Sequence, residues 1–231
     1  MKGAYTAQDA RSIQLMFARI ASRYDLANTL LSAGMDHFWR RYVARQVAAW
    51  RPRRVLDLAS GSGALASAIQ RAIPGAEVVG ADFCAPLLLR SRRRRLSRLV
   101  VADALALPFA DTAFDVVTVA FGLRNMASYH RALSEMRRVL APGGHLVILD
   151  FSLPTGPWLP LYRLYLHHVL PRFAGWLTGV ADAYEYLGQS IEAFPRGHRM
   201  MALLNEVGFT AETCRPLSTG VVSVYIARRE G

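Results

Sequence analysis

A run of small residues follows the first predicted strand, in the stretch RVLDLASGSGALAS at positions 54–67. Gly61 and Gly63 leave this turn almost free of side chains, so a ligand can approach the backbone closely. The helix predicted after the turn presents free N–H groups at its first residues. The turn, including Ala59 and Ser60, is therefore a candidate site for a nucleotide-type ligand. A strand-to-helix turn that binds no ligand would have the same pattern.

Three acidic residues lie at the ends of predicted strands. Asp57 ends the strand before the turn, Asp82 ends the next strand, and Asp103 follows the third. Asp82 lies 19 residues after Gly63, where a carboxylate can accept hydrogen bonds from ribose hydroxyls. Asp103 could meet an adenine amino group. The turn and Asp82 alone fit NAD as well as S-adenosylmethionine.

Strand and helix patterns alternate from residue 54 onward. They predict an α/β fold with a mostly parallel, doubly wound sheet of seven strands, whose ligands bind at the carboxyl ends of the strands. Pro142 and Gly143 are expected to stop the helix that begins at residue 129. The predicted strands cover 54–59, 77–83, 99–104, 114–122, 145–151, 211–217 and 220–229, and the helices between them cover 64–73, 86–99, 129–144 and 199–209.

Two helical blocks flank the core pattern. Residues 8–50 predict helices with Ile13, Phe17 and Ile20 on one stripe, and Asp36 as the N-cap of the second helix;. Residues 157–200 predict short helices broken by prolines. We therefore divide a single domain, 1–231, into N-terminal helices (1–50), a cofactor-binding core (51–152), a helical substrate cap (153–200) and a C-terminal helix with two strands (201–231).

Composition excludes several classes of protein. The chain is 52% hydrophobic, which argues against disorder, yet charged residues or prolines interrupt every apolar stretch before it could span a membrane;. The N-terminus lacks the apolar segment of a secretory signal, so we expect a cytoplasmic location. Cys84 and Cys214 lack metal-ligand spacing, and no metal site is expected.

The formal charge of +11 is almost entirely arginine. An arginine run at 90–98 could hold the protein against the anionic inner face of a membrane, although a biased base composition of the gene would produce the same excess. We expect no nucleic-acid partner, because the run lacks interleaved aromatic residues.

Three core stretches resemble a Rossmann-like class I S-adenosylmethionine-dependent methyltransferase: DLASGSG at 57–63, VADALALPF at 101–109 and VLAPGGHLVILD at 139–150. Further stretches resemble the ubiquinone and menaquinone biosynthesis C-methyltransferase family in particular, and YDLANTLLS and FGLRN are the most specific of them. The chain departs from that family at Ala27, where Met is usual, and at Ser62-Gly63-Ala64, where Thr-Gly-Asp is common. The second departure removes an acid near the cofactor.

The resemblance implies methyl transfer from S-adenosylmethionine to a ring carbon of a polyprenylated quinol. Arg124 could stabilise the quinol anion beside Asn125, and Asp150 could act as a base or an orienting group. The family motif implies that Tyr24 closes over the cofactor, and His168, Tyr184 and Tyr186 are candidates for the quinol pocket. The expected cofactor-binding residues are Tyr24, Asp57, Ala59, Ser60, Gly61, Gly63, Asp82, Phe83, Asp103, Ala104 and Phe121.

Several alternatives stay open at this point. Demethylmenaquinol is the first acceptor we expect, with the 2-methoxy-6-polyprenyl-1,4-benzoquinol of ubiquinone synthesis second and another small aromatic or lipid acceptor third. The altered SGSGA turn would also suit a non-catalytic subunit that has lost cofactor binding. The oligomeric state, including a homo-oligomer, is undetermined by the sequence.

Overall fold

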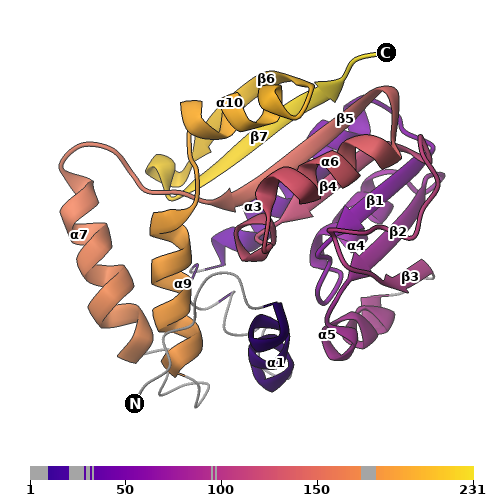
Figure 1. Ribbon diagram of the computed structural model, residues 1–231. Coiled ribbons are helices and arrows are strands. Elements are labelled where there is room, and N and C mark those ends of the chain that lie inside the picture. Colours follow the sequence, from indigo (N-terminus) through magenta and orange to yellow (C-terminus); the bar gives the residue numbers. More distant parts are fainter. Residues whose placement is uncertain are drawn as a thin grey trace.

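The computed structural model describes residues 10–20, 29, 32, 34–94, 96, 98–172 and 181–231 of the chain. Its centre is a seven-stranded sheet in the order β3-β2-β1-β4-β5-β7-β6 (Figure 1). All neighbours from β3 to β5 are parallel, and β7 runs antiparallel to β5 and β6. The mostly parallel α/β sheet is thus confirmed. The strands are β1 (Arg54–Leu58), β2 (Glu77–Asp82), β3 (Arg98–Val101), β4 (Phe114–Ala120), β5 (Leu140–Phe151), β6 (Phe209–Leu217) and β7 (Val222–Arg229).

The strand order reverses between β1 and β4. From β1 the chain moves outward through β2 and β3, and it then returns to place β4 on the other side of β1. At such a point the connections after the two strands leave toward opposite sides and open a crevice at their carboxyl ends. The glycine turn after β1 and the FGLRN stretch after β4 both lie at this crevice.

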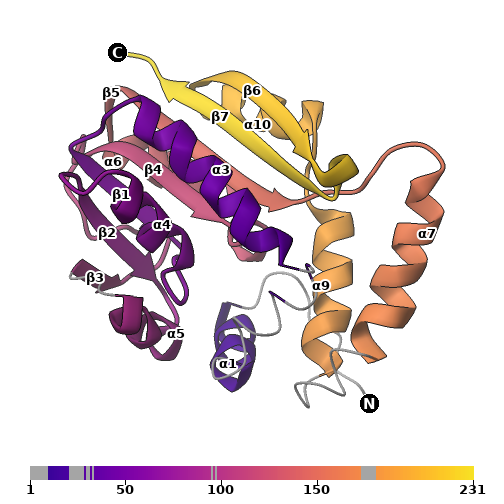
Figure 2. The same cartoon turned by 180° about the vertical axis from the view of Figure 1, so that it is seen from behind.

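Side chains point alternately to the two faces of the sheet, and helices cover both faces. Leu56 and Val117 pack on one face against α6 (Tyr129–Val139) and α10 (His198–Glu206). Val55 and Val116 pack on the other against α3 (Met35–Ala49) and α4 (Ala64–Ala72). Figures 1 and 2 show these two helical layers from opposite sides. Because both faces are covered, the strands are nearly continuous apolar runs.

Several predicted helix limits are wrong. The helix predicted over 199–209 ends at Glu206, and residue 209 begins β6. The helix after β2, α5, covers only Ala85–Arg90 and continues as a 3-10 turn, η1 (Ser91–Arg94). The helix α6 ends at Val139, because Pro142 favours extended backbone before it, and residues 141–144 bulge out of β5 between its pairs with β4;. The N-cap of α3 is Gly34 with φ of 79°, so Asp36 lies inside the first turn.

The two helical blocks come together beside the sheet. The N-terminal block contributes α1 (Ala10–Ile20), and the later block contributes α7 (Trp158–Leu164), the π-helical turn η3 (Tyr165–Val169) and α9 (Ala181–Ala193). Ile13 and Met16 of α1 join Leu166 and Tyr184 in one buried cluster. Figures 1 and 2 show α7 and α9 side by side beyond the end of β5. They form a cap over the carboxyl ends of the central strands.

Candidate active site

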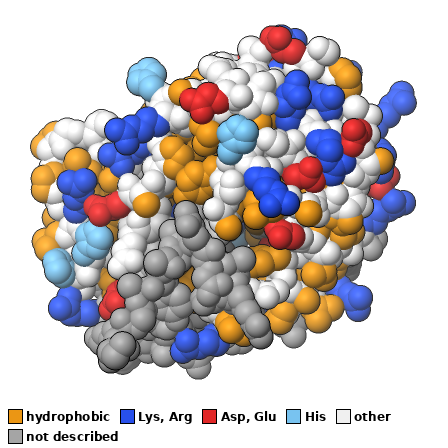
Figure 3. Space-filling model, in the orientation of Figure 1, with side chains coloured by type: hydrophobic (Ala, Val, Ile, Leu, Met, Phe, Trp, Pro, Cys, Tyr) orange, Lys and Arg blue, Asp and Glu red, His pale blue; other side chains and the backbone are white. Residues whose placement is uncertain are grey.

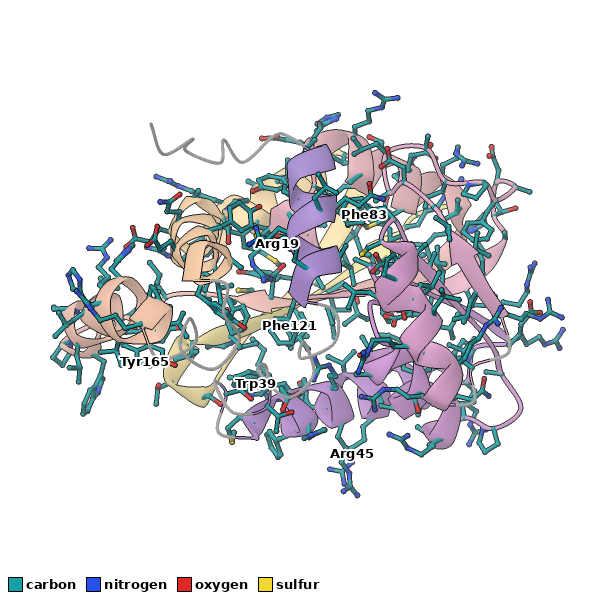
Figure 4. The ribbon with its side chains drawn as sticks, turned by 90° about the horizontal axis from the view of Figure 1, so that it is seen from below. Arg19, Trp39, Arg45, Phe83, Phe121 and Tyr165 are labelled. Atoms are coloured by element: carbon teal, nitrogen blue, oxygen red, sulfur yellow. The ribbon has the colours of Figure 1, made fainter. Side chains whose placement is uncertain are left out.

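Two cavities meet at the carboxyl ends of the central strands. The first lies among the ends of β1, β2, β3 and β4, and the second lies between the ends of β4 and β5, α3 and the cap. Phe121 and Asn125, which follow β4, line both cavities. Figure 4 shows Phe121 centrally, with Trp39 and Tyr165 on the side of the second cavity and Phe83 on the side of the first. Ligands in the two cavities would touch at these shared residues.

Asp57 supports the glycine turn from behind. Its buried carboxylate accepts hydrogen bonds from the hydroxyls of Ser60 (2.8 Å) and Thr118 (2.7 Å) and from the N–H of Ala66 in α4 (3.1 Å). Burial raises the pKa of this carboxyl to about 6, although the hydrogen bonds oppose the shift;. Asp57 does not line the first cavity. It positions the turn and the first turn of α4.

Gly63 is required by packing. Its φ of 77° is in the left-handed region, and a Cβ there would lie 2.5 Å from Leu96 and 2.7 Å from Ser91. The turn therefore packs directly against the η1 segment. Gly63 and Ser60, both predicted to bind the cofactor, do not line the first cavity.

Asp82 faces the first cavity and also fixes its wall. One carboxylate oxygen accepts the N–H of Gly61 at 2.7 Å, and the other accepts the N–H of Cys84 at 2.8 Å. Burial raises its pKa against these two hydrogen bonds. Each oxygen of an ionised carboxylate keeps a second acceptor site. Asp82 can therefore accept hydrogen bonds from two adjacent hydroxyls of a ligand.

The floor of the first cavity depends on small residues. A Cβ on Gly122 would lie 2.4 Å from the Cβ of Ala59, so the loops after β1 and β4 touch here. Ala59 and Phe121 both have positive φ, at 52° and 59°. Such strained backbone is common where a structure is shaped around a ligand.

Asp103 completes the polar wall of the first cavity. It is exposed, and its Oδ1 accepts the N–H of Leu105 at 2.9 Å. Among the described residues its other oxygen accepts no hydrogen bond that would compete with an amino group of a ligand in the cavity. Acidic residues at two points and apolar residues between them fit a nucleoside with its base and sugar at opposite ends.

The sequence prediction found much of this cavity. The predicted residues that line it are Ala59, Gly61, Asp82, Phe83, Asp103, Ala104 and Phe121. Tyr24 lies outside the described residues. The sequence did not predict the apolar and small residues of the wall, because no sequence pattern distinguishes a cavity wall from the core. These residues are Leu58, Leu87, Ala102, Leu105, Ala120, Gly122, Met126 and Ala127.

The second cavity, of about 340 Å³, has a mainly apolar and aromatic wall that includes Arg124, one partner of a buried ion pair. Nη1 of Arg124 donates to Oδ1 of Asp150 at 2.6 Å and to the carbonyl of Phe121 at 2.6 Å. The guanidinium carbon lies 5.1 Å from the ring centroid of Phe151. Its Nε is buried and has no hydrogen-bond partner among the described residues. Arg124 thus keeps donor capacity that the fold does not use.

Asp150 forms the ion pair that holds Arg124 in place. Its carboxylate is fully buried, and it also accepts the backbone N–H of Phe151 at 2.8 Å and that of Arg124 at 3.3 Å. Asp150 does not line the second cavity. It is placed to orient the guanidinium, one of the two roles that the sequence allowed.

Asn125 and Tyr186 connect the two cavities to the cap. The hydroxyl of Tyr186 donates to Oδ1 of Asn125 at 3.2 Å, and Nδ2 of Asn125 donates to the carbonyl of Phe121 at 3.4 Å. Tyr184 also lines the second cavity. Burial raises the pKa of Tyr186, so its hydroxyl stays protonated and able to donate;.

A second ion pair, which sequence reasoning missed, comes from α3. Arg40 pairs with Asp36, and its guanidinium carbon lies 5.5 Å from the ring centroid of Phe121. Both residues line the second cavity together with Trp39, whose Nε1 donates to Ser218 at 2.9 Å. The spacing of four residues between Asp36 and Arg40 is typical of an ion pair on a helix. It does not indicate that this ion pair lies at a cavity.

Other predicted residues lie elsewhere. His168 is exposed on η3 and does not line the second cavity. In the arginine run, Arg92 is exposed, and Arg98 pairs with Glu77 at 2.5 Å. Among the described residues no cluster of His, Cys, Asp and Glu could hold a metal ion. No helix in the described ranges has the length and apolar character needed to cross a membrane.

A seven-stranded, mostly parallel sheet with a cavity at its switch point defines a Rossmann-like fold that binds its ligand at the carboxyl ends of the strands;. Solved structures share this fold: a methyltransferase from Thermotoga maritima (TM-score 0.65, 16% identity, covering 93% of this chain and 98% of that one) and human N-acetylserotonin methyltransferase (TM-score 0.62, 17% identity, covering 93% and 58%). Residues 5–229 match the ubiE/COQ5 methyltransferase family, and the chain belongs to that family.

Relatives cover nearly the full chain. A demethylmenaquinone methyltransferase of Thermus thermophilus is 47% identical over 220 residues, covering 93% of this chain and 100% of the relative. A demethylmenaquinone methyltransferase of Deinococcus radiodurans is 44% identical over 222 residues, covering 94% and 92%. The chain is an S-adenosylmethionine-dependent methyltransferase, and the alternative of a non-catalytic subunit is not retained.

Proposed function

We propose that this enzyme methylates a ring carbon of a polyprenylated demethylmenaquinol. The observation that carries the proposal is the position of Arg124, a cationic side chain held by Asp150, in the wall of an aromatic cavity that touches the first cavity. The relatives named demethylmenaquinone methyltransferase support the naphthoquinol ring. The benzoquinol of ubiquinone synthesis is the second acceptor to test.

The first cavity fits S-adenosylmethionine by the chemistry of its walls. Asp82 would accept hydrogen bonds from the ribose hydroxyls, Asp103 would accept one from the adenine amino group, and Gly61 lines the cavity without a side chain;. When bound, the cofactor supplies an electrophilic methyl group on a sulfonium. Phe121 and Asn125, shared by the two cavities, would lie beside the reacting carbon atoms.

Arg124 would stabilise the anionic form of the quinol. Loss of the hydroxyl proton makes the ring carbon next to that oxygen electron-rich and nucleophilic. A guanidinium in surroundings that exclude water favours the anion much more than it would in water. Asp150 would hold the guanidinium in place from its buried position. The ring hydrogen at the methylated carbon then leaves as a proton to water, which restores the aromatic ring as the quinol anion, and protonation of its oxygen gives the methylated quinol.

Arg40 would hold the second oxygen of the ring. A 1,4-quinol carries its oxygens at opposite ends, so one arginine cannot reach both closely. Arg40 approaches the cavity from α3, and Arg124 approaches from the end of β4. Tyr184 and Tyr186 would contact the ring from the cap, with Tyr186 donating to Asn125. The exposed His168 has no part in this arrangement.

A polyprenyl tail makes peripheral contact with a membrane reasonable, and we propose this together with a cytoplasmic location. The described part of the arginine run offers Arg90 and Arg92 for anionic lipid headgroups;. A homo-oligomer would also be compatible with the fold.

The test supplies the purified enzyme with methyl-labelled S-adenosylmethionine and either reduced demethylmenaquinone or the reduced benzoquinone precursor, each with a short tail, in detergent. Label in the naphthoquinol alone supports the proposal. Label in the benzoquinol alone corrects the acceptor. If neither acceptor is labelled while the cofactor still raises the melting temperature, the proposed substrate is wrong.

A further inference from the structure

Exposed apolar side chains are concentrated on one helix of the cap. Four of the nine large hydrophobic side chains that are exposed among the described residues lie between residues 158 and 169. They are Trp158, Leu161, Leu164 and Val169, exposed by 61, 58, 53 and 51%. Scattered exposed hydrophobic residues are normal on a soluble protein, but a cluster of them marks an interaction surface.

These four side chains define what we call the outer face of α7 and η3. Trp158, Leu161 and Leu164 follow the three-residue spacing that keeps side chains on one side of a helix;. The other side of the same helix is also apolar, because Leu166 and Leu170 are buried and line the second cavity. A helix that is apolar on both sides is normally buried on both. Here the described chain covers only one side.

The charge around the outer face is basic. The sequence from residue 151 to residue 181 contains no Asp or Glu, but it contains Arg163 and Arg172. His167 and His168 are exposed on the same helix. Figure 3 shows hydrophobic side chains at the left edge of the molecule, where α7 lies in Figure 1, with basic, histidine and a few acidic side chains among them. Arg163 and His167 pair with Glu192 of α9 at 3.0 and 3.3 Å. The exposed Arg172 and His168 stand outside these pairs. Exposed apolar side chains flanked by such a basic residue are complementary to an anionic lipid surface.

We propose that the outer face of α7 and η3 inserts into the headgroup region of an anionic bilayer. Trp158 would lie at the level of the headgroups, where Trp is enriched, and the three aliphatic side chains would reach the acyl chains. Because the opposite side of this helix lines the second cavity, the ring could enter the enzyme while the tail stays in lipid. This inference rests on the proposed quinol substrate.

The first experiment measures co-sedimentation with vesicles of phosphatidylcholine containing phosphatidylglycerol at 30 mol%, a composition chosen for the test. The variant Leu161→Gln/Leu164→Gln removes two apolar side chains from the outer face. The matched control is Phe38→Gln on α3, where the phenylalanine is 58% exposed. We expect the double variant to bind at least about tenfold more weakly, from the apolar area withdrawn from lipid, and the control to bind like the unchanged enzyme.

A second measurement separates this inference from the proposed function. Turnover of a short-tailed quinol in detergent should be the same in the double variant and the unchanged enzyme, whereas turnover of a long-tailed quinol embedded in the vesicles should fall with vesicle binding. If the unchanged enzyme does not turn over the short-tailed quinol in detergent, the proposed substrate is contradicted instead.

Three results would overturn the inference. The unchanged enzyme could fail to bind vesicles, or the double variant could bind them equally well. Light scattering could also show that the double variant converts a dimer into monomers without changing vesicle binding. The outer face would then be an interface between two copies of this chain.

Discussion

Nη1 of Arg124 lies 2.6 Å from Oδ1 of Asp150. The two residues are 26 positions apart, one after β4 and the other near the end of β5, and adjacent parallel strands bring them together. Only the arginine reaches the second cavity. The buried carboxylate therefore fixes the orientation of a guanidinium that forms part of the cavity wall.

Arg124→Lys should lower kcat for the quinol by about 10²–10³, the usual effect of losing one donor to a developing anion in a site without water. A lysine keeps the charge but loses the planar fork that reaches both Asp150 and the ligand. The measurement is steady-state turnover, with cofactor binding followed by calorimetry. Arg131→Lys, at an exposed position on α6, is the control. Equal kcat values for Arg124→Lys and the unchanged enzyme would exclude the role.

Arg40→Gln should raise KM for the quinol by about tenfold, the value of one charge-assisted hydrogen bond. The same variant should have no effect on a naphthol analogue that lacks the second hydroxyl, because the contact with Arg40 is then absent in both enzymes. Arg45→Gln is the control, since Figure 4 shows Arg45 on the same helix pointing away from the cavity. Equal losses with both acceptors would mean that Arg40 only supports the fold.

Asp82→Asn should weaken binding of S-adenosylmethionine by about 10–100-fold. The amide group would turn an N–H toward either Gly61 or Cys84, whose backbone N–H groups now donate to the carboxylate. Isothermal titration of the variant measures the effect. Asp103→Asn provides the comparison, because Asp103 is exposed and should matter less. A larger loss from Asp103→Asn would reverse our ranking of the two acids.

Asp57 should make the protein less stable as the pH rises. Its pKa is about 6 when folded and 3.8 ordinarily, so between these values the folded state binds a proton that the unfolded state has lost. The free energy of unfolding therefore falls from about pH 4 to pH 7, by about 3 kcal/mol for this group.

Urea denaturation of the unchanged enzyme and of Asp57→Asn checks this pH dependence. The advantage of the unchanged enzyme over the variant should shrink as the pH rises, because other titrating groups contribute to both proteins alike. Parallel stability curves across this range would show that Asp57 is ionised throughout.

Gly122→Ala should cost about 1–3 kcal/mol of stability, because its Cβ would overlap that of Ala59 at 2.4 Å;. Ala59→Gly removes that Cβ and also relieves the positive φ of 52°;. The double variant should therefore recover most of the loss. Thermal denaturation of the unchanged enzyme, the two single variants and the double variant measures the interaction energy between the two positions. Gly75→Ala is the control, since nothing lies within 4 Å of its Cβ. Additive losses would show that the two loops adjust independently.

The sequence by itself determined the order of strands and helices and the positions of the glycine turn, Asp82 and Arg124. These follow from hydrophobic periodicity and from local motifs, which act over a few residues. It failed at helix ends such as Val139, where the residues before Pro142 and the pairing with β4 decide the boundary.

Only the tertiary structure decided which polar residues face a cavity. Asp57 and Asp82 both lie near strand ends, yet the first points behind the turn and the second into the cavity. The side chain of Asp150 is buried and pairs with Arg124, and Arg40 of α3 lies beside Phe121. The physical reason is that a side chain's direction depends on strand pleat, twist and the packing of distant elements, and these are fixed only when the chain is folded.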